Sequence, residues 1–599
     1  MIYHCEDHTC NYWDEGEKLP ERCPQCGRKL LRANEADMTG DDWTALGNTL
    51  WDAEASDKKR MVDCFRKAAY LGSAWGVCNL GICMEQGNGV EADPVQAFWL
   101  YQQAVEMGSL NAVCCLGVCY EYGIGTAPDA KQAAELYCKA AEYGSPRGQM
   151  LLACAFHDGI GVEADAAEAV YWVRAAAYQR YGEGMHRLGV CYEYGDGVEQ
   201  NWEHAVHWFR EAAESGVSAA MTDLGYCYEK GCGVEQSWEQ AFSWYRRGAE
   251  CGYPVSMSNL GLCYKRGYGV EQNWQEAIKW YEQGAQCGDL QSMHNLACCY
   301  ERGEGVDQNE DRALYWYRRS AEGGNGDAMC NLGRCYERGY GVEQNWQEAV
   351  KWYEQGAQCG NLQSMHSLAY CYERGEGVKQ NMTEAIRWYT AAAEGGNADA
   401  MHNLGWHYDY GEGVEQDMKK AICWYERAAE QNHPAAMNSL GECYAMGLGV
   451  PRDLETAMEW YRRAAELGEA MADYNMGWHL EQAGKLSEAY AHYRKAADGN
   501  DDSAWWALGR FYENGVVVAQ DGKEARRCYE TGEKLGSVKC KMRLARCKLL
   551  GIGGRRAKKA GLDLCRQALE LAKESSEKED YGYEAEMNLL RRTIAENES

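Results

Sequence analysis

The sequence predicts an all-α fold: a right-handed α/α solenoid of about fourteen helix pairs behind a small cysteine-rich head. Three observations support this prediction. A leucine followed by a small residue, most often glycine, recurs every 36 residues from Leu80 to Leu440. Apolar residues around each of these leucines follow helical spacing. The 599 residues include 67 Gly, 41 Tyr and 22 Trp but only 8 Pro and 6 Phe, a bias that is typical of a short motif repeated many times.

Four cysteines in residues 1–33 predict a metal-binding head. Cys5, Cys10, Cys23 and Cys26 follow the pattern C-x4-C-x12-C-x2-C, and this stretch resembles a small zinc ribbon. Two such pairs can supply the four thiolates of a tetrahedral structural zinc site, which leaves no open position for catalysis. A redox pair is the alternative, but the sequence around it lacks the βαβ pattern typical of redox motifs.

The segment from Met257 to Gly288 illustrates one repeat. Leu260 and Tyr264 fall on one face of a predicted first helix, which Gly267 ends because glycine accepts a positive φ. Asn273 is a candidate N-cap for the second helix. The two helices of one unit cannot bury both of their apolar faces alone, so neighbouring units must stack into an array.

The repeat resembles a known family. It is similar to the Sel-1-like repeat, a 36-residue relative of the tetratricopeptide repeat. The pattern that carries this similarity is A-M-x-x-L-G-x-x-Y-x-x-G-x-G-V followed by A-x-x-W-Y-x-x-A-A-x-x-G. The resemblance covers residues 41–554 and implies a helical solenoid that acts as an adaptor or scaffold. Residues 555–599 are predicted to form a basic segment and capping helices.

Ten cysteines stand three residues after an anchor leucine, where a small apolar side chain would pack in the core. They are Cys83, Cys119, Cys191, Cys227, Cys263, Cys299, Cys335, Cys371, Cys443 and Cys547. Secreted cysteine-rich members of the family carry disulfide ladders, but this chain uses a different column and its start does not resemble a secretory signal. We therefore predict reduced, buried thiols and a cytoplasmic protein.

One stripe of the first helices varies between repeats, and in tetratricopeptide relatives the corresponding stripe lines a concave groove. The resemblance thus implies that a protein or peptide binds there, and the acidic row described next favours a basic amphipathic segment. The predicted groove residues are Tyr226, Leu262, Arg334, Tyr370 and Trp406, with an acidic row of Glu229, Glu301, Glu337 and Glu373. The alternative is that these glutamates are merely solvated and neutralised by neighbouring arginines.

The predicted function is a non-enzymatic scaffold, and two other classes fit less well. Some cysteine-rich relatives are penicillin-binding-type hydrolases, but the Ser-x-x-Lys matches at 56–59 and 575–578 lack the Ser-Asp-Asn and Lys-Thr-Gly partner motifs. Nucleic-acid binding through the zinc ribbon and the basic segment 534–559 is the third possibility. The net charge of −30 argues against it, and no apolar run is long enough for a membrane span.

Overall fold

A computed structural model of the chain describes residues 2–5, 13–15, 30–32, 35–51, 55–578 and 583–598. Three short strands, β1 (Ile2–Cys5), β2 (Trp13–Glu15) and β3 (Leu30–Arg32), form an antiparallel sheet in the order β2-β1-β3. A 3-10 turn, η1 (Glu35–Asp37), follows them. The rest of the described secondary structure is α-helical, which confirms the predicted all-helical array.

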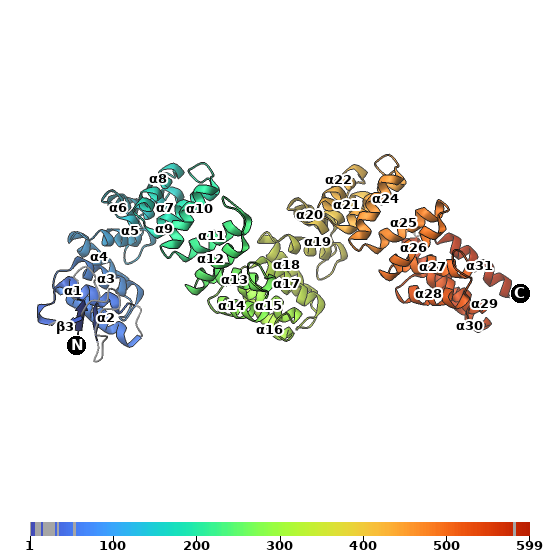
Figure 1. Cartoon of the computed structure of the whole chain (residues 1–599), viewed down its shortest axis with the longest axis horizontal. Coiled ribbons are helices and arrows are strands. Elements are labelled where there is room, and N and C mark those ends of the chain that lie inside the picture. The colour runs from blue at the N-terminus through green and yellow to red at the C-terminus, as the bar shows by residue number, and fades with distance from the viewer. Residues whose placement is uncertain are drawn as a thin grey trace. The chain divides into compact units, whose positions relative to one another are not determined.

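The chain divides into two compact units, Met1–Gln308 and Asn309–Ser599. In the first unit, seven helical hairpins succeed one another along the chain (Figure 1). They are α1 (Gly40–Thr49) with α2 (Ala55–Tyr70), α3 (Ala74–Gln86) with α4 (Pro94–Glu106), α5 (Leu110–Tyr122) with α6 (Ala130–Glu142), α7 (Pro146–Asp158) with α8 (Ala166–Tyr178), α9 (Gly182–Tyr194) with α10 (Trp202–Glu214), α11 (Ser218–Lys230) with α12 (Trp238–Glu250), and α13 (Pro254–Arg266) with α14 (Trp274–Gln286). Helix α15 (Leu290–Arg302) packs on α14.

The second unit begins with α16 (Glu310–Glu322) and continues with seven further hairpins. They are α17 (Gly326–Arg338) with α18 (Trp346–Gln358), α19 (Leu362–Arg374) with α20 (Met382–Glu394), α21 (Ala398–Tyr410) with α22 (Met418–Glu430), α23 (Pro434–Met446) with α24 (Leu454–Glu466), α25 (Ala470–Gln482) with α26 (Leu486–Asp498), α27 (Asp502–Asn514) with α28 (Gly522–Lys534), and α29 (Val538–Leu550) with α30 (Lys558–Lys578). A last helix, α31 (Glu584–Glu598), packs on α29 and α30.

Helix boundaries follow the chemistry expected from the sequence. Helix α13 ends at Gly267, which adopts a left-handed φ of 74°. Two residues later Gly269 has a φ of 67°, and a Cβ there would lie 2.2 Å from the carbonyl oxygen of Trp238 in the preceding repeat. The side chain of Asn273 then accepts a hydrogen bond from the backbone N–H of Glu276 and caps α14. The loop therefore ends one helix, contacts the previous hairpin and starts the next helix.

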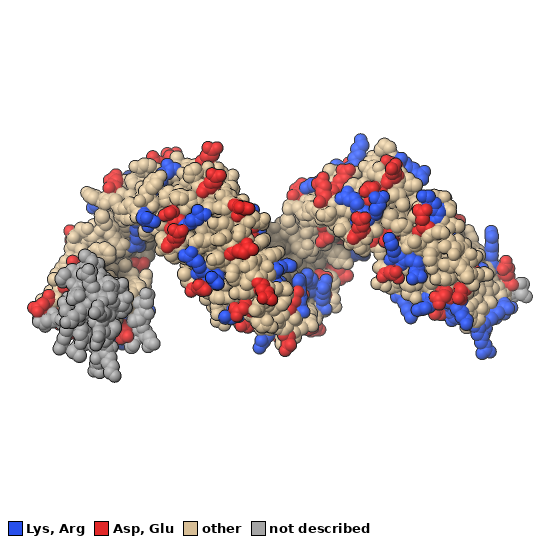
Figure 2. Space-filling model, viewed as in Figure 1, with Lys and Arg blue, Asp and Glu red and all other residues tan. Residues whose placement is uncertain are grey.

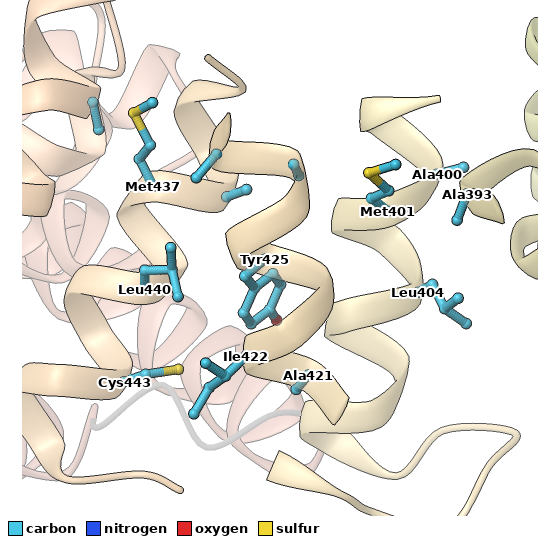
Figure 3. Packing of buried hydrophobic residues seen from close by; sticks show 14 of the residues in the cluster. Ala393, Ala400, Met401, Leu404, Ala421, Ile422, Tyr425, Met437, Leu440 and Cys443 are labelled. Atoms are coloured by element: carbon cyan, nitrogen blue, oxygen red, sulfur yellow. The ribbon is translucent and has the colours of Figure 1, made fainter. Parts of the chain in front are cut away.

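A tyrosine of most second helices explains the small residue after the anchor leucine. Tyr281 is fully buried, and a Cβ on Gly261 would lie 2.5 Å from its ring. In the second unit Tyr425 lies among buried residues of the cluster that contains Leu404 and Leu440 (Figure 3). Leucine, small residue and tyrosine thus form one packing unit that fixes the hairpin.

The C-terminal end of the array differs from the predicted boundary in one respect. Residue 554, where the sequence suggested that the repeats stop, lies in the connection between α29 and α30, which pack against each other as a hairpin. Helix α31 then covers α29 and α30. Helices α30 and α31 therefore complete the last hairpin and cap it, as expected for terminal elements of a repeat array.

Candidate functional site

The predicted groove residues of the first unit lie on the outer surface of two first helices. Tyr226 on α11 is 42% exposed and Leu262 on α13 is 37% exposed. The amino group of Lys230, one turn after Tyr226, lies 5.8 Å from the centre of the tyrosine ring. Both apolar side chains are therefore available at the surface of this unit.

The second unit carries the remaining residues of the stripe. Tyr370 on α19 is 40% exposed, with the guanidinium of Arg374 lying 5.7 Å from its ring centre. Trp406 on α21 is half-buried and packs against Tyr410, with ring centres 4.8 Å apart. Arg334 on α17 donates a hydrogen bond of 2.8 Å to the side chain of Asn331. The sequence analysis placed these positions on one stripe, but the residues of that stripe are divided between the two compact units.

The acidic row has a structural role that the sequence analysis did not assign. In seven of the described repeats its carboxylate accepts a hydrogen bond from the hydroxyl of the buried tyrosine on the second helix, sixteen residues later in the chain. The pairs are Tyr101–Glu85, Tyr137–Glu121, Tyr245–Glu229, Tyr353–Glu337, Tyr389–Glu373, Tyr425–Asp409 and Tyr529–Glu513. The oxygen atoms lie 2.6 Å apart in Tyr101–Glu85 and 2.9 Å apart in Tyr245–Glu229. These carboxylates therefore tie the two helices of one hairpin together.

Glu373 shows how much of this acidic charge is already engaged. Its carboxylate accepts from the Tyr389 hydroxyl at 2.7 Å and lies 3.7 Å from Nε2 of His407. Burial alone would raise the pKa of Glu373, but the hydrogen bonds from His407 and Tyr389 hold it below its usual value. Arg374 approaches the same carboxylate at 3.9 Å. Glu229, Glu301 and Glu337 are likewise half-buried, so the row is not a freely solvated acidic surface.

A repeat with a basic residue in this row serves as an exception. Lys265 occupies the position, and the hydroxyl of Tyr281 is then buried without a hydrogen-bond partner. The ammonium of Lys265 instead lies 3.2 Å from Glu304 in the following repeat. Pairing the tyrosine column with the acidic column sixteen residues earlier would have revealed this relation from the sequence.

The ten thiols of the repeated cysteine column are all buried, as predicted. Burial raises the pKa of Cys263 to about 12, and Cys371 and Cys443 behave in the same way. A thiol with such a pKa stays protonated at neutral pH and is a poor nucleophile or metal ligand. No group of three or more side chains able to hold a metal ion is present within the described ranges.

The basic segment 534–559 is partly engaged inside the protein. Arg543 and Arg546 on α29 form ion pairs with Glu513 of α27, and Arg543 also donates to Glu586 of α31 at 2.7 Å. Trp506 donates its indole N–H to Glu586 at 3.2 Å. The arginines therefore hold α31 on the end of the array, and elsewhere acidic and basic side chains are interspersed on the visible surface (Figure 2).

The predicted zinc ligands lie in the N-terminal head. Cys10, Cys23 and Cys26 lie outside the described residues, as does the side chain of Cys5. The backbone of Cys5 ends β1 and pairs with Leu30 of β3. The Ser-x-x-Lys matches fall on α2 and α30, where the side chains of Ser56 and Ser575 are also outside the described set.

None of the helices in the described ranges is long and apolar enough to cross a bilayer.

No curated protein matches the chain by sequence. Among solved structures, c5321, a protective antigen of uropathogenic Escherichia coli with an SLR fold, is 32% identical over 75% of this chain and 97% of its own, with a TM-score of 0.50. A Sel1 repeat protein from Oxalobacter formigenes is also 32% identical, over 41% of this chain and 96% of its own, with a TM-score of 0.37.

The family comparison matches most of the array. The Sel1 repeat matches the segments 76–109, 112–145, 146–181, 182–217, 218–253, 254–289, 290–325, 326–361, 362–397, 398–433, 434–469, 470–501 and 504–537. The matched segments follow the hairpins described above, each from a first helix to the start of the next. The chain belongs to the Sel1 repeat family.

Proposed function

We propose that the protein is a non-enzymatic scaffold that binds a protein or peptide segment along the exposed stripe of its first helices. Sel1 repeat proteins generally act as protein-interaction scaffolds, and the comparisons indicate no catalytic family. The observation that carries the proposal is the exposure of Tyr226, Leu262 and Tyr370 at equivalent positions of different repeats. Exposed aromatic side chains are frequent anchors of protein interfaces.

The contribution of charge differs from that of the aromatic residues. The carboxylates of Glu229 and Glu373 are engaged by tyrosine hydroxyls and by the adjacent cations Lys230 and Arg374. Direct ion pairs with a partner would compete with these contacts. A segment that carries Lys or Arg is still favoured in its approach by the net charge of −30, which acts mainly on the association rate.

The test compares two variants of the full-length protein. Tyr370→Ala with Trp406→Ala removes the two aromatic side chains of the second unit's stripe. The control is Tyr315→Ala, which removes a 51% exposed tyrosine from α16, a second helix of the same unit. Proteins retained from a lysate of the native cell are compared for both variants and the wild type, and the dissociation constant is then measured for the retained partner.

We expect the double variant to weaken binding by at least tenfold at every salt concentration, because each interface aromatic can contribute more than about 1–2 kcal/mol. Tyr315→Ala should leave the affinity unchanged. Equal affinity of the wild type and the double variant would contradict the proposal. A large loss of helical stability in the double variant would do so as well, because it would show that these side chains stabilise the fold.

We also propose that Cys5, Cys10, Cys23 and Cys26 bind one structural zinc ion. Two observations support this proposal: the C-x4-C-x12-C-x2-C spacing and the antiparallel sheet of β1 to β3, in which Cys5 is the last residue of β1.

The buried thiol column, which shows no disulfide ladder in the described part of the chain, supports a reducing compartment such as the cytoplasm.

A further inference from the structure

Three thiols gather around one arginine in the first helices of three successive repeats. Cys78 lies on α3, Cys114 and Cys115 lie on α5, and Arg147 lies in the first turn of α7. Nη1 of Arg147 is 3.5 Å from Sγ of Cys115 and 2.7 Å from the side-chain oxygen of Asn111. The amide nitrogen of Asn111 in turn donates to Sγ of Cys78 at 3.5 Å. Asn111 and Arg147 therefore connect the thiols of Cys78 and Cys115 in one cluster.

The arginine in this cluster needs a negative partner. Its side chain is half-buried and donates hydrogen bonds to a neutral amide and a cysteine sulfur, and within the described residues it forms no ion pair with a carboxylate. A desolvated guanidinium is stabilised by an adjacent anion and is costly without one. The sulfur of Cys115 is the group in contact with it that can become an anion.

The acidity of the neighbouring thiols agrees with this geometry. The interaction with the Cys78 thiol and the positive charge of Arg147 lower the pKa of Cys115, although burial and the carboxylate of Glu85 oppose them. The pKa of Cys78 is raised, because its thiol interacts with Cys115. Cys119, one turn further along α5 and away from Arg147, has its pKa raised by burial to about 12.

We propose that Cys115 is a reactive thiolate that is oxidised by a small peroxide, and that Cys78 resolves the product to a disulfide between α3 and α5. This modification site is independent of the proposed partner-binding stripe. Cys115 keeps 5% of its surface exposed and Cys78 keeps 1%. The access is sufficient only for a small uncharged oxidant of the hydrogen peroxide class, and a bulky reagent or a protein thiol would be excluded.

The reaction balances in two steps. The Cys115 thiolate attacks one oxygen of the peroxide, the O–O bond breaks, and Cys115 becomes a sulfenic acid while hydroxide leaves. The sulfur of Cys78 then attacks the Cys115 sulfur and displaces the second oxygen as water. The proton of the Cys78 thiol goes to the departing oxygen, and two thiols and one peroxide give one disulfide and two waters. A small thiol reductant reverses the modification by thiol–disulfide exchange.

The test treats the full-length protein with hydrogen peroxide at pH 7 and maps every cysteine by differential alkylation and mass spectrometry. We expect oxidation at Cys115 at least tenfold faster than at Cys119, since reactivity follows the thiolate fraction. The product should be a Cys78–Cys115 bridge that a small thiol reduces. Equal rates at Cys115 and Cys119, or oxidation of Cys115 with Cys78 left as a thiol, would overturn the proposal.

Three variants separate reactivity from folding. Arg147→Lys keeps the positive charge and should keep most of the rate, whereas Arg147→Gln should lower it by about tenfold. Cys78→Ser should stop the reaction at the sulfenic acid, which mass spectrometry detects as one added oxygen on Cys115. Thermal unfolding followed by circular dichroism checks that each variant folds. If Arg147→Gln folds and reacts as fast as the wild type, the arginine does not activate the thiol and the proposal is wrong.

Discussion

The hydrogen bond between Tyr245 and Glu229 offers a direct test of how each hairpin is held together. Tyr245→Phe removes the hydroxyl that donates to Glu229 over 2.9 Å and leaves the ring in place beside Gly225. The ring is 1% exposed, so water cannot replace the lost donor. Hydrogen bonds to charged groups contribute about 1.5–3 kcal/mol. Glu229 retains an ion pair with Lys230 at 2.7 Å, so we expect a loss near the lower end, about 1.5 kcal/mol.

Tyr281→Phe is the matched control for this substitution. Tyr281 occupies the equivalent position in the next repeat and is fully buried, but its hydroxyl has no hydrogen-bond partner. Removing a buried, unsatisfied hydroxyl relieves a desolvation penalty of about 1–3 kcal/mol. The same chemical change should therefore leave this hairpin equally stable or make it more stable.

Native-state hydrogen exchange with mass spectrometry is the appropriate assay, because a solenoid opens locally and a global melting curve averages over many repeats. Peptides from α11 and α12 report on the first variant, and peptides from α13 and α14 report on the second. Tyr245→Phe should accelerate exchange in its own hairpin by about tenfold, whereas Tyr281→Phe should not accelerate it. Similar losses in both variants would refute the idea that the carboxylate column stabilises the hairpins.

Two other predictions concern the head and the second unit. The purified protein should contain about one equivalent of zinc by elemental analysis, and Cys23→Ser with Cys26→Ser should remove it without changing the helical circular dichroism signal; a metal-free wild type would contradict this. Burial, aided by the neighbouring His433, lowers the pKa of His402 from 6.5 to about 4. Between these values the unfolded state binds more protons, so the stability around α21 should fall by up to about 3 kcal/mol as the pH drops from 6.5 to 4. Hydrogen exchange at several pH values measures this fall, which His402→Asn should flatten.

Much of the array could be predicted because each repeat contains the same local signals for helix formation, helix ends and packing. The anchor Leu260, the C-terminal Gly267 and the cap Asn273 all act in the structure as their residue types suggest. Helical periodicity and caps depend on residues within one turn of each other, which a single sequence displays. The burial of the cysteine column also follows from its place three residues after the leucine.

The roles of the polar columns were harder to predict because they depend on contacts between helices. The sequence analysis placed Glu373 in an acidic row of a binding groove, whereas in the structure it lies 3.9 Å from Arg374 and accepts a hydrogen bond from Tyr389 of the paired helix. Likewise, the positive run that includes Arg543 looked like a surface patch, but its partner Glu586 lies on α31, 43 residues later. The sign of a charge is visible in the sequence, but its distance from an opposite charge is a property of the fold.

The repeats that depart from the acidic column show that this position has two ways of holding the array together. In the seven pairs described above, its carboxylate accepts a hydrogen bond from a tyrosine of the same hairpin. Where it is His157, Nε2 of the imidazole lies 3.2 Å from Asp196, and where it is Lys265, the ammonium lies 3.2 Å from Glu304. Asp196 and Glu304 occupy equivalent places in the loop of the following repeat, 39 residues after their partners.

A basic side chain in this column therefore replaces a hydrogen bond within one hairpin with a contact between two hairpins. The effect of this replacement on the stability of the hairpin differs between the two cases. The repeat of His157 has Val173 in place of the tyrosine, so no hydroxyl is left without an acceptor. The repeat of Lys265 keeps Tyr281 and buries its hydroxyl unsatisfied. Because the contacts with Asp196 and Glu304 join neighbouring repeats and not the two helices of one hairpin, the first arrangement preserves the stability of its own hairpin, whereas the second gives up part of it.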